Sequence, residues 1–164
     1  MSNKHKAKLY KVLWRNGEPA HGGSGKWHLP KGKRPGKWMP QIEDPTCCRR
    51  GYHLAAAGQL LQWLSPGLVV WEAEGRGAHH DKYDKSAWAE ARLVRKVGVW
   101  TEQKARLFDA DCAEMVPRID ASLRAGTWAA GVAWDAAWVA VRVAQSRRLL
   151  YWLKRDRRNR GLDD

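Results

Sequence analysis

The spacing of the apolar residues changes at Trp100, and this change constrains the fold more than any other feature of the chain. Before it, residues 86–97 alternate small apolar side chains with bulky or charged ones, as in a strand that has one charged face. After it, apolar residues recur at helical spacing behind Thr101, a suitable N-cap, and Pro117 is expected to end that helix. A chain that passes once from strands to helices is typical of an α+β fold.

The 164 residues are enough for one domain with a core of its own. We expect an α+β core domain over residues 1–116, a Trp- and Ala-rich helical extension over 117–153 that packs on it, and a basic tail over 154–164. The helix near 127–153 is apolar around much of its circumference, so it packs on the domain, pairs with a second copy as a homodimer, or does both. The sequence thus predicts a mixed or antiparallel sheet covered by C-terminal helices. The predicted strands lie near 7–14, 49–55, 68–75 and 86–98, with a short helix at 56–64 and longer helices near 101–116 and 127–153.

A long loop is expected over residues 17–45, because this segment is rich in Gly and holds five of the seven Pro. It contains two similar Lys-Trp pairs, Lys26-Trp27 and Lys37-Trp38. A lysine beside an exposed indole combines neutralisation of a phosphate with stacking on a base. The alternative is that the two indoles fold inward and anchor the loop.

The charge of the chain points to a polyanionic partner. Lys and Arg number 30 against 17 Asp and Glu, which gives a formal net charge of +13. Residues 1–50 carry 12 basic and 3 acidic side chains and residues 146–164 carry 7 and 3, while the middle is nearly neutral. We therefore expect the two ends to bind nucleic acid or another polyanion, unless each end is only a solvated segment. The candidate nucleic-acid-binding residues are Lys26, Trp27, Arg34, Lys37, Trp38, Arg49, Arg50, Arg155, Arg157 and Arg158.

The three cysteines do not form the framework of a secreted protein, although Cys47 and Cys48 are adjacent. The N-terminus has no apolar stretch of signal-peptide length, and no run approaches the roughly 18 apolar residues of a membrane span. We therefore expect a reduced, cytoplasmic environment and no membrane contact. Small buried thiols are favoured over a metal or redox site at the vicinal pair. Residues 75–82 are expected to form a mobile hairpin or a loop. His79 and His80 in this segment point to opposite faces of an extended chain, so no metal is expected.

Part of the chain resembles a family of uncharacterised proteins that is common in actinobacteria and their phages. The similarity runs from about Leu9 to Val116 and is carried by Cys-Arg-Arg-Gly-Tyr-His-Leu-Ala at residues 48–55 and Trp-Glu-Ala-Glu-Gly at residues 71–75. The resemblance implies a bacterial or phage-infected host cell. It implies no reaction, and it is compatible with a catalytically silent accessory protein that binds nucleic acid or a host protein.

A weaker similarity is to the middle of the ADP-ribosyltransferase superfamily, where a Gly-x-aromatic-apolar-Ala strand precedes a short helix and a strand that ends in Glu-x-x-Gly. Residues 51–55 and 72–75 follow that order. The resemblance implies an ADP-ribosyltransferase-like sheet, NAD as cofactor and transfer of ADP-ribose to a nucleic-acid base. In such a site a carboxylate at the ribose stabilises the oxocarbenium character that develops as the glycosidic bond of NAD breaks.

This resemblance also implies roles for single residues. His53 falls on the position that lines the nicotinamide pocket, Trp63 lies near the ring that stacks on nicotinamide, and Glu90 is the candidate catalytic carboxylate. Tyr10 and Arg15 stand in or after the strand that contacts the adenosine ribose. The residues by themselves leave structural alternatives open, with Glu90 as a solvated or Arg92-paired carboxylate on a half-exposed strand and His53 as a core histidine bonded to the backbone.

Two functions of different classes are therefore expected. One is an NAD-dependent ADP-ribosyltransferase with nucleic acid as acceptor, and the other is a non-enzymatic basic protein that binds nucleic acid or a host protein. Walker loops, zinc-ligand spacing and the order of a Ser-His-Asp triad are all absent from the sequence, so hydrolytic and nucleotide-dependent enzymes have no positive support. Consumption of NAD distinguishes the two hypotheses.

Overall fold

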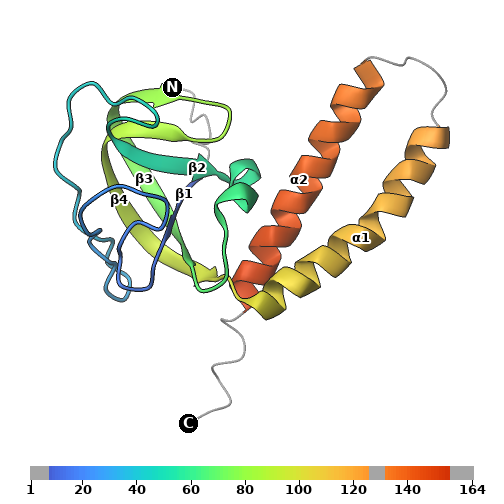
Figure 1. Ribbon diagram of the computed structural model, residues 1–164, viewed down its shortest axis with the longest axis horizontal. Helices are drawn as coiled ribbons and strands as arrows, with labels where there is room; N and C mark the ends of the chain where they lie inside the picture. Colours follow the sequence, from blue (N-terminus) through green and yellow to red (C-terminus); the bar gives the residue numbers. More distant parts are fainter. Residues whose placement is uncertain (1–7, 126–131, 156–164) are drawn as a thin grey trace, which may run out of the picture.

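Four antiparallel strands form a small closed barrel, and two long helices follow it in the chain (Figure 1). The computed structural model describes residues 8–125 and 132–155, and describes side chains only within 8–114 and 141–155. The order of the strands around the barrel is β1-β2-β4-β3, and β1 closes it by pairing with β3. The elements are β1 (Leu9–Leu13), β2 (Tyr52–Ala56), β3 (Val69–Asp81), β4 (Ser86–Val99), α1 (Glu102–Ala125) and α2 (Val132–Lys154), with two 3-10 turns at Ala57–Gln59 and Leu61–Trp63.

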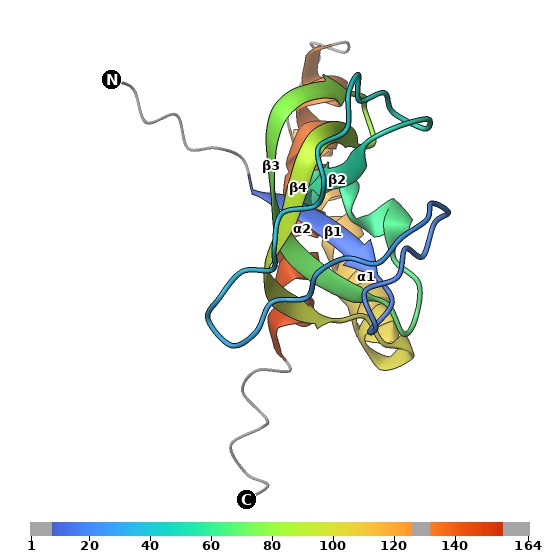
Figure 2. The same ribbon diagram turned by 90° about the vertical axis from the view of Figure 1, so that its left-hand side faces the viewer.

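The barrel is closed unevenly. β1 pairs with β3 along its whole length, and β3 and β4 form a long hairpin, whereas β1 and β2 share only two paired positions. Beside β2, backbone amides of the loop 17–45 bond to the free edge of β4. Gly36, Met39 and Ile42 donate to carbonyl oxygens of β4 at 2.8–2.9 Å. The loop lies on the side of the barrel opposite the helices (Figure 1, Figure 2), and it covers an edge that would otherwise be unpaired.

Alternation along the strands produces two cores. On β1, Leu13 points into the barrel, while Val12 points outward to the helices. The inner core consists mainly of Leu13, Leu54, Val69, Trp71, Ala73, Ala91, Leu93, Val99 and Trp27. The outer core joins the barrel wall to the helices and includes Tyr10, Val12, Leu68, Val70, Val97, Trp100, Phe108, Leu149 and Leu153.

The helices contact the barrel where α1 begins and α2 ends, and their far ends extend away from it (Figure 1). The last turn of α2 crosses β4 at Gly98, where any side-chain carbon would overlap the carbonyl oxygen of Leu153. On the helices, Asp111 accepts a hydrogen bond from the Trp152 indole at 2.7 Å and pairs with Arg148 at 3.3 Å. Within the described residues, neither helix has a stretch that is long and apolar enough to cross a membrane.

The predicted α+β class, the four strands and the two long helices are confirmed, and the sheet is antiparallel. The loop 17–45 contains only isolated bridges, as its composition indicates. The start of the predicted helix near 127–153 lies outside the described residues, which resume at Val132.

Three local predictions differ from the structure. Residues 75–82, expected as a mobile hairpin or a loop, belong to the β3–β4 hairpin and are not a loop, because β3 continues to Asp81 and finds partners on β4 as far as Ser86. The predicted helix at 56–64 is two 3-10 turns. α1 continues through Pro117 to Ala125, so the expected division between residues 116 and 117 falls inside a helix. A proline inside a helix removes one amide donor and usually kinks or ends the helix, but here the helix continues past it.

Candidate functional site

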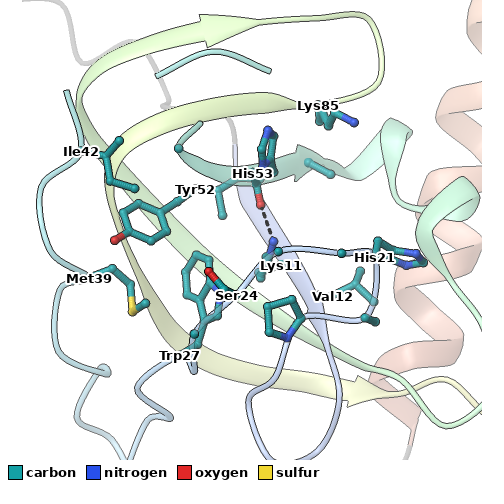
Figure 3. A pocket seen from close by; sticks show the side chains of 18 of the residues that line it. Lys11, Val12, His21, Ser24, Trp27, Met39, Ile42, Tyr52, His53 and Lys85 are labelled. Atoms are coloured by element: carbon teal, nitrogen blue, oxygen red, sulfur yellow. Dashed lines mark hydrogen bonds between the residues drawn. The ribbon is translucent and has the colours of Figure 1, made fainter. Parts of the chain in front are cut away.

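A cleft of about 930 Å³ opens where β1 and β2 diverge (Figure 3). Its floor comes from β1 with Lys11 and from β2 with Tyr52 and His53. Its rim comes from residues 19–28 and 39–42 of the long loop and from residues 48–51, which lead into β2. Trp63 and Lys85 complete the lining on the side of the 3-10 turns. The cleft therefore exists because the two paired positions of β1 and β2 do not hold the rest of these strands together.

The cleft lining is cationic. None of the described residues that line it is Asp or Glu. A concave surface lined by one sign of charge focuses the electrostatic potential and attracts ligands of the opposite sign. The basic and titratable cationic side chains of the lining are Lys11, Lys26, Arg49, Arg50 and Lys85, together with His21, His28 and His53.

Lys11 lies at the centre of the floor. It is half-buried, its Nζ donates a hydrogen bond to the carbonyl oxygen of His53 at 3.0 Å, and Nζ is 5.1 Å from the centre of the Trp27 ring. Burial, with a smaller contribution from the nearby Lys85 charge, lowers the pKa of Lys11 to about 8. The amine thus has a carbonyl oxygen and an indole face as neighbours, and the cleft lining offers it no carboxylate.

His53 is held in its neutral form. The backbone N–H of Cys48 donates to Nε2 at 3.0 Å, and a protonated ring nitrogen could not accept that bond. Burial lowers the pKa of His53, and the charges of Lys11 and Lys85 lower it further. The adjacent N–H of Cys47 donates in the same way to Nδ1 of His80 at 3.2 Å. Two consecutive amides of the segment before β2 are therefore anchored by two imidazole rings.

Three aromatic side chains line the cleft in different ways. Trp27 is buried in the barrel and packs edge to face against the Tyr52 ring, with the two ring centres 5.5 Å apart. Tyr52 is half-buried and donates its hydroxyl to the carbonyl oxygen of Pro40 at 2.7 Å. Trp63 is half-buried and carries the Lys85 ammonium 4.6 Å from its ring centre. Tyr52 and Trp63 thus keep part of their surface accessible.

The structure places only some of the residues that the resemblance assigns to NAD in the cleft. His53, Trp63 and Tyr10 line the cleft, whereas Arg15 is exposed elsewhere and Glu90 is not part of the lining. Glu90 lies on the outer face of β4 and forms an ion pair with Arg76 on β3. The hydrogen bond from Arg76 lowers the pKa of this carboxyl group. Glu90 is therefore an ion-paired carboxylate, but its partner is Arg76 and not the expected Arg92, which pairs with Glu74. NAD-dependent transfer stays a prediction, and the described cleft lining supplies no carboxylate for it.

The predicted nucleic-acid-binding residues are also divided. Lys26, Arg49 and Arg50 are exposed at the rim of the cleft. Arg34 and Lys37 are exposed on the same loop outside the cleft lining.

The two Lys-Trp pairs differ in their tryptophans. Trp27 anchors the loop from inside the barrel, as the alternative expected. Trp38 is half-buried on the outer face of the hairpin, with the guanidinium carbons of Arg76 and Arg92 at 4.1 and 4.6 Å from its ring centre. Arg92 is itself paired with Glu74 across the hairpin at 2.7 Å. Neither indole is therefore a free stacking surface.

The C-terminal basic residues can be placed only in part. Arg155 follows α2, is exposed, and lies 5.0 Å from the Trp152 ring centre. Arg157 and Arg158 lie outside the described residues. The predicted homodimer through the helix at 127–153 stays a prediction, and the side chains of residues 132–140 of α2 also lie outside the described residues.

Sequence reasoning missed Lys11, Lys85 and His21, which line the cleft. One signal was present for Lys11. In an alternating strand it shares a face with Leu9 and Leu13, and a lysine between two leucines on one face is unusual for a solvated side chain. No comparable local signal marks Lys85, because its place depends on the β3–β4 turn folding back against Trp63.

Among residues 8–125 and 132–155, no group of three or more His, Cys, Asp and Glu side chains is arranged to hold a metal ion. Cys47 is buried, and burial raises the pKa of its thiol. In comparisons with known proteins, no protein-family model, no curated protein and no solved structure matches this chain.

Proposed function

We propose that this protein binds nucleic acid and that the basic cleft is its binding site. The observation that carries the proposal is the lining of the cleft, in which Lys and Arg side chains gather and none of the described residues is Asp or Glu. Such a site attracts anions. Its positive charges repel one another when no anion is bound, and a bound anion relieves this repulsion. Phosphate groups are the anions that Lys and Arg neutralise in nucleic-acid complexes.

A polymer fits the cleft better than a small anion does. Lys26, Arg49 and Arg50 are exposed at the rim, so they reach phosphates that continue beyond the cleft. Arg34 and Lys37 extend the exposed basic surface along the same loop. The net charge of +13 attracts a polyanion over a longer distance than any single contact. These features together favour a ligand with many phosphates in series.

A single strand is the form that the cleft favours. A volume of about 930 Å³ lies within the range of ligand-binding sites and admits nucleotide units, but not the width of a duplex. The half-buried ring of Tyr52 is on the lining, where an unpaired base can contact it, whereas the Lys85 ammonium already lies over the Trp63 ring. Base contacts of this kind tolerate different sequences, so we expect little sequence preference.

The test compares two double variants that remove the same charge. Arg49→Gln with Arg50→Gln removes two guanidinium groups from the rim of the cleft. Arg106→Gln with Arg147→Gln removes two exposed guanidinium groups from the helices and serves as the matched control. Binding of fluorescently labelled single-stranded DNA, single-stranded RNA and duplex is measured by anisotropy over a series of salt concentrations.

We expect the rim variant to reduce the slope of log affinity against log salt by about 1.4 on single strands, which is about 0.7 for each lost phosphate contact. The control variant should keep the slope of the original protein. Equal losses in the two variants would show that net charge acts without the cleft. No binding at low salt would refute the proposed function.

A further inference from the structure

Lys11 differs from an ordinary surface lysine in where its amine is held. It stands on β1, where it pairs with Trp71 of β3, and the pairing of β1 with β2 ends one residue earlier at Tyr10, so Lys11 lies at the floor of the cleft where the two strands begin to diverge (Figure 3). Its Nζ donates one hydrogen to the carbonyl oxygen of His53. In the neutral amine the lone pair then points away from that carbonyl. The geometry therefore presents a fixed amine to whatever enters the cleft.

The surroundings of Lys11 favour the neutral, nucleophilic form. A carboxylate partner would hold a lysine as an ammonium ion, and none lines the cleft among the described residues. Lys85, in contrast, pairs with Asp84 at 3.5 Å and stacks on Trp63, so it keeps its charge close to Lys11. A lysine that is desolvated and placed near another cation is the arrangement that makes amines reactive toward carbonyl compounds. With a pKa of about 8, about half of the Lys11 side chains are neutral at pH 8.

We propose that Lys11 is a reactive amine that captures aldehydes at the floor of the cleft, and that its substrate class is the abasic nucleotide of a single strand. This inference rests on the proposed function, because the basic rim would deliver the strand. A nucleotide that has lost its base exposes a sugar aldehyde, whereas an intact nucleotide has none. Loss of the base also leaves a smaller unit, which can approach the floor beside Tyr52 more closely than a complete nucleotide.

The chemical step is the formation of an imine. The lone pair of neutral Nζ attacks the aldehyde carbon, a C–N bond forms, and the electrons of the C=O double bond move to the oxygen, which takes up a proton. That proton replaces one that the attacking nitrogen releases. The resulting carbinolamine loses one water, made from its hydroxyl group and the second proton of the nitrogen, and a C=N bond forms between the sugar carbon and Nζ. Nothing is oxidised or reduced, so no further reactant is needed.

The experiment traps this imine. The full-length protein is incubated at pH 8 with a labelled single-stranded oligonucleotide that contains one abasic site, and cyanoborohydride then reduces any imine to a stable amine. The adduct is counted on a denaturing gel and located by peptide mass mapping. An intact oligonucleotide and one with a tetrahydrofuran abasic analogue, which has no aldehyde, serve as ligand controls. Lys11→Arg keeps the charge but lacks a primary amine, and Lys33→Arg is the matched control on the exposed loop outside the cleft lining.

We expect an adduct only with the true abasic strand, mapped to Lys11 in the original protein, kept in Lys33→Arg and lost in Lys11→Arg. Anisotropy is measured in parallel on every variant, and Lys33→Arg, which lies outside the cleft lining, should bind the strand as the original protein does. An adduct mapped to another lysine would overturn the inference even if Lys11→Arg did not fold. Binding of all strands without any adduct would overturn it and leave the proposed function in place. Absence of binding to every strand, together with absence of an adduct, would refute both.

Discussion

Replacing Lys11 with Met should make the protein more stable at neutral pH. The original side chain has a pKa of about 8 in the fold against 10.5 for a lysine in water, so its charged form is disfavoured by folding. This difference corresponds to a penalty of about 3 kcal/mol at pH 7. Met has nearly the same length and no charge, but it loses the hydrogen bond to His53, which contributes about 1 kcal/mol. We therefore expect Lys11→Met to raise the free energy of unfolding by about 2 kcal/mol at pH 7.

The pH dependence provides the decisive comparison for Lys11→Met. Because the folded pKa lies below the unfolded one, the unfolded chain binds more protons between pH 8 and 10.5, and the original protein gains stability as the pH rises through this range. At pH 10 the remaining penalty is below about 1 kcal/mol, so the advantage of the variant should disappear.

Urea unfolding followed by tryptophan fluorescence at pH 7 and pH 10 measures both values for the two proteins. Groups that titrate in both proteins cancel in the difference between them. A variant that is less stable at both pH values, or equally stabilised at both, would refute the reasoning.

Three further changes test other contacts. Gly98→Ala should destabilise the protein by about 1–3 kcal/mol because the new methyl group overlaps the Leu153 carbonyl oxygen. Thermal unfolding measures this loss, and an unchanged melting temperature would contradict the close approach of the two backbones. Acidification should destabilise the fold below about pH 6.5 because the neutral His53 ring accepts the Cys48 amide, and His53→Gln should flatten that part of the stability profile measured by urea unfolding. Trp38→Leu should cost about 1–2 kcal/mol in chemical unfolding through the loss of two guanidinium contacts, and a neutral effect would mean that the loop is held by its backbone bonds alone.

The order and the approximate bounds of the strands and long helices could be predicted because they depend on local spacing. Alternating apolar residues identify the inner side of β4, and the predicted alternation of Ala89, Ala91 and Leu93 is the buried side in the structure. The period of 3.6 likewise identifies the helices that follow Trp100. The failures arose where a distant partner overrides a local signal. Residues 75–81 in isolation look like a mobile hairpin or a loop, and they form a regular strand of the hairpin because β4 supplies hydrogen-bond partners.

The basic character of the candidate site could be predicted from the sequence, but the location of the cleft could not. The basic surplus of residues 1–50 is readable from composition, and Lys26, Arg49 and Arg50 do reach one cleft. The partners of the ion pairs cannot be predicted from the sequence, because an ion pair between strands depends on the register in which the strands pair. Glu90 and Arg76 are 14 residues apart and meet only because β3 and β4 pair at that position.

The sequence by itself determined the α+β class, the basic character of the chain and the irregular loop, since alternation, net charge and the positions of Gly and Pro act within a few residues. Only the tertiary structure decided that the barrel closes unevenly, that Trp27 turns inward while Trp38 docks on arginines, and that Lys11 meets the carbonyl of His53, 42 residues away. Such contacts depend on which strands pair and in which register, and the free energy of that choice is distributed over the whole core rather than stored in any one segment.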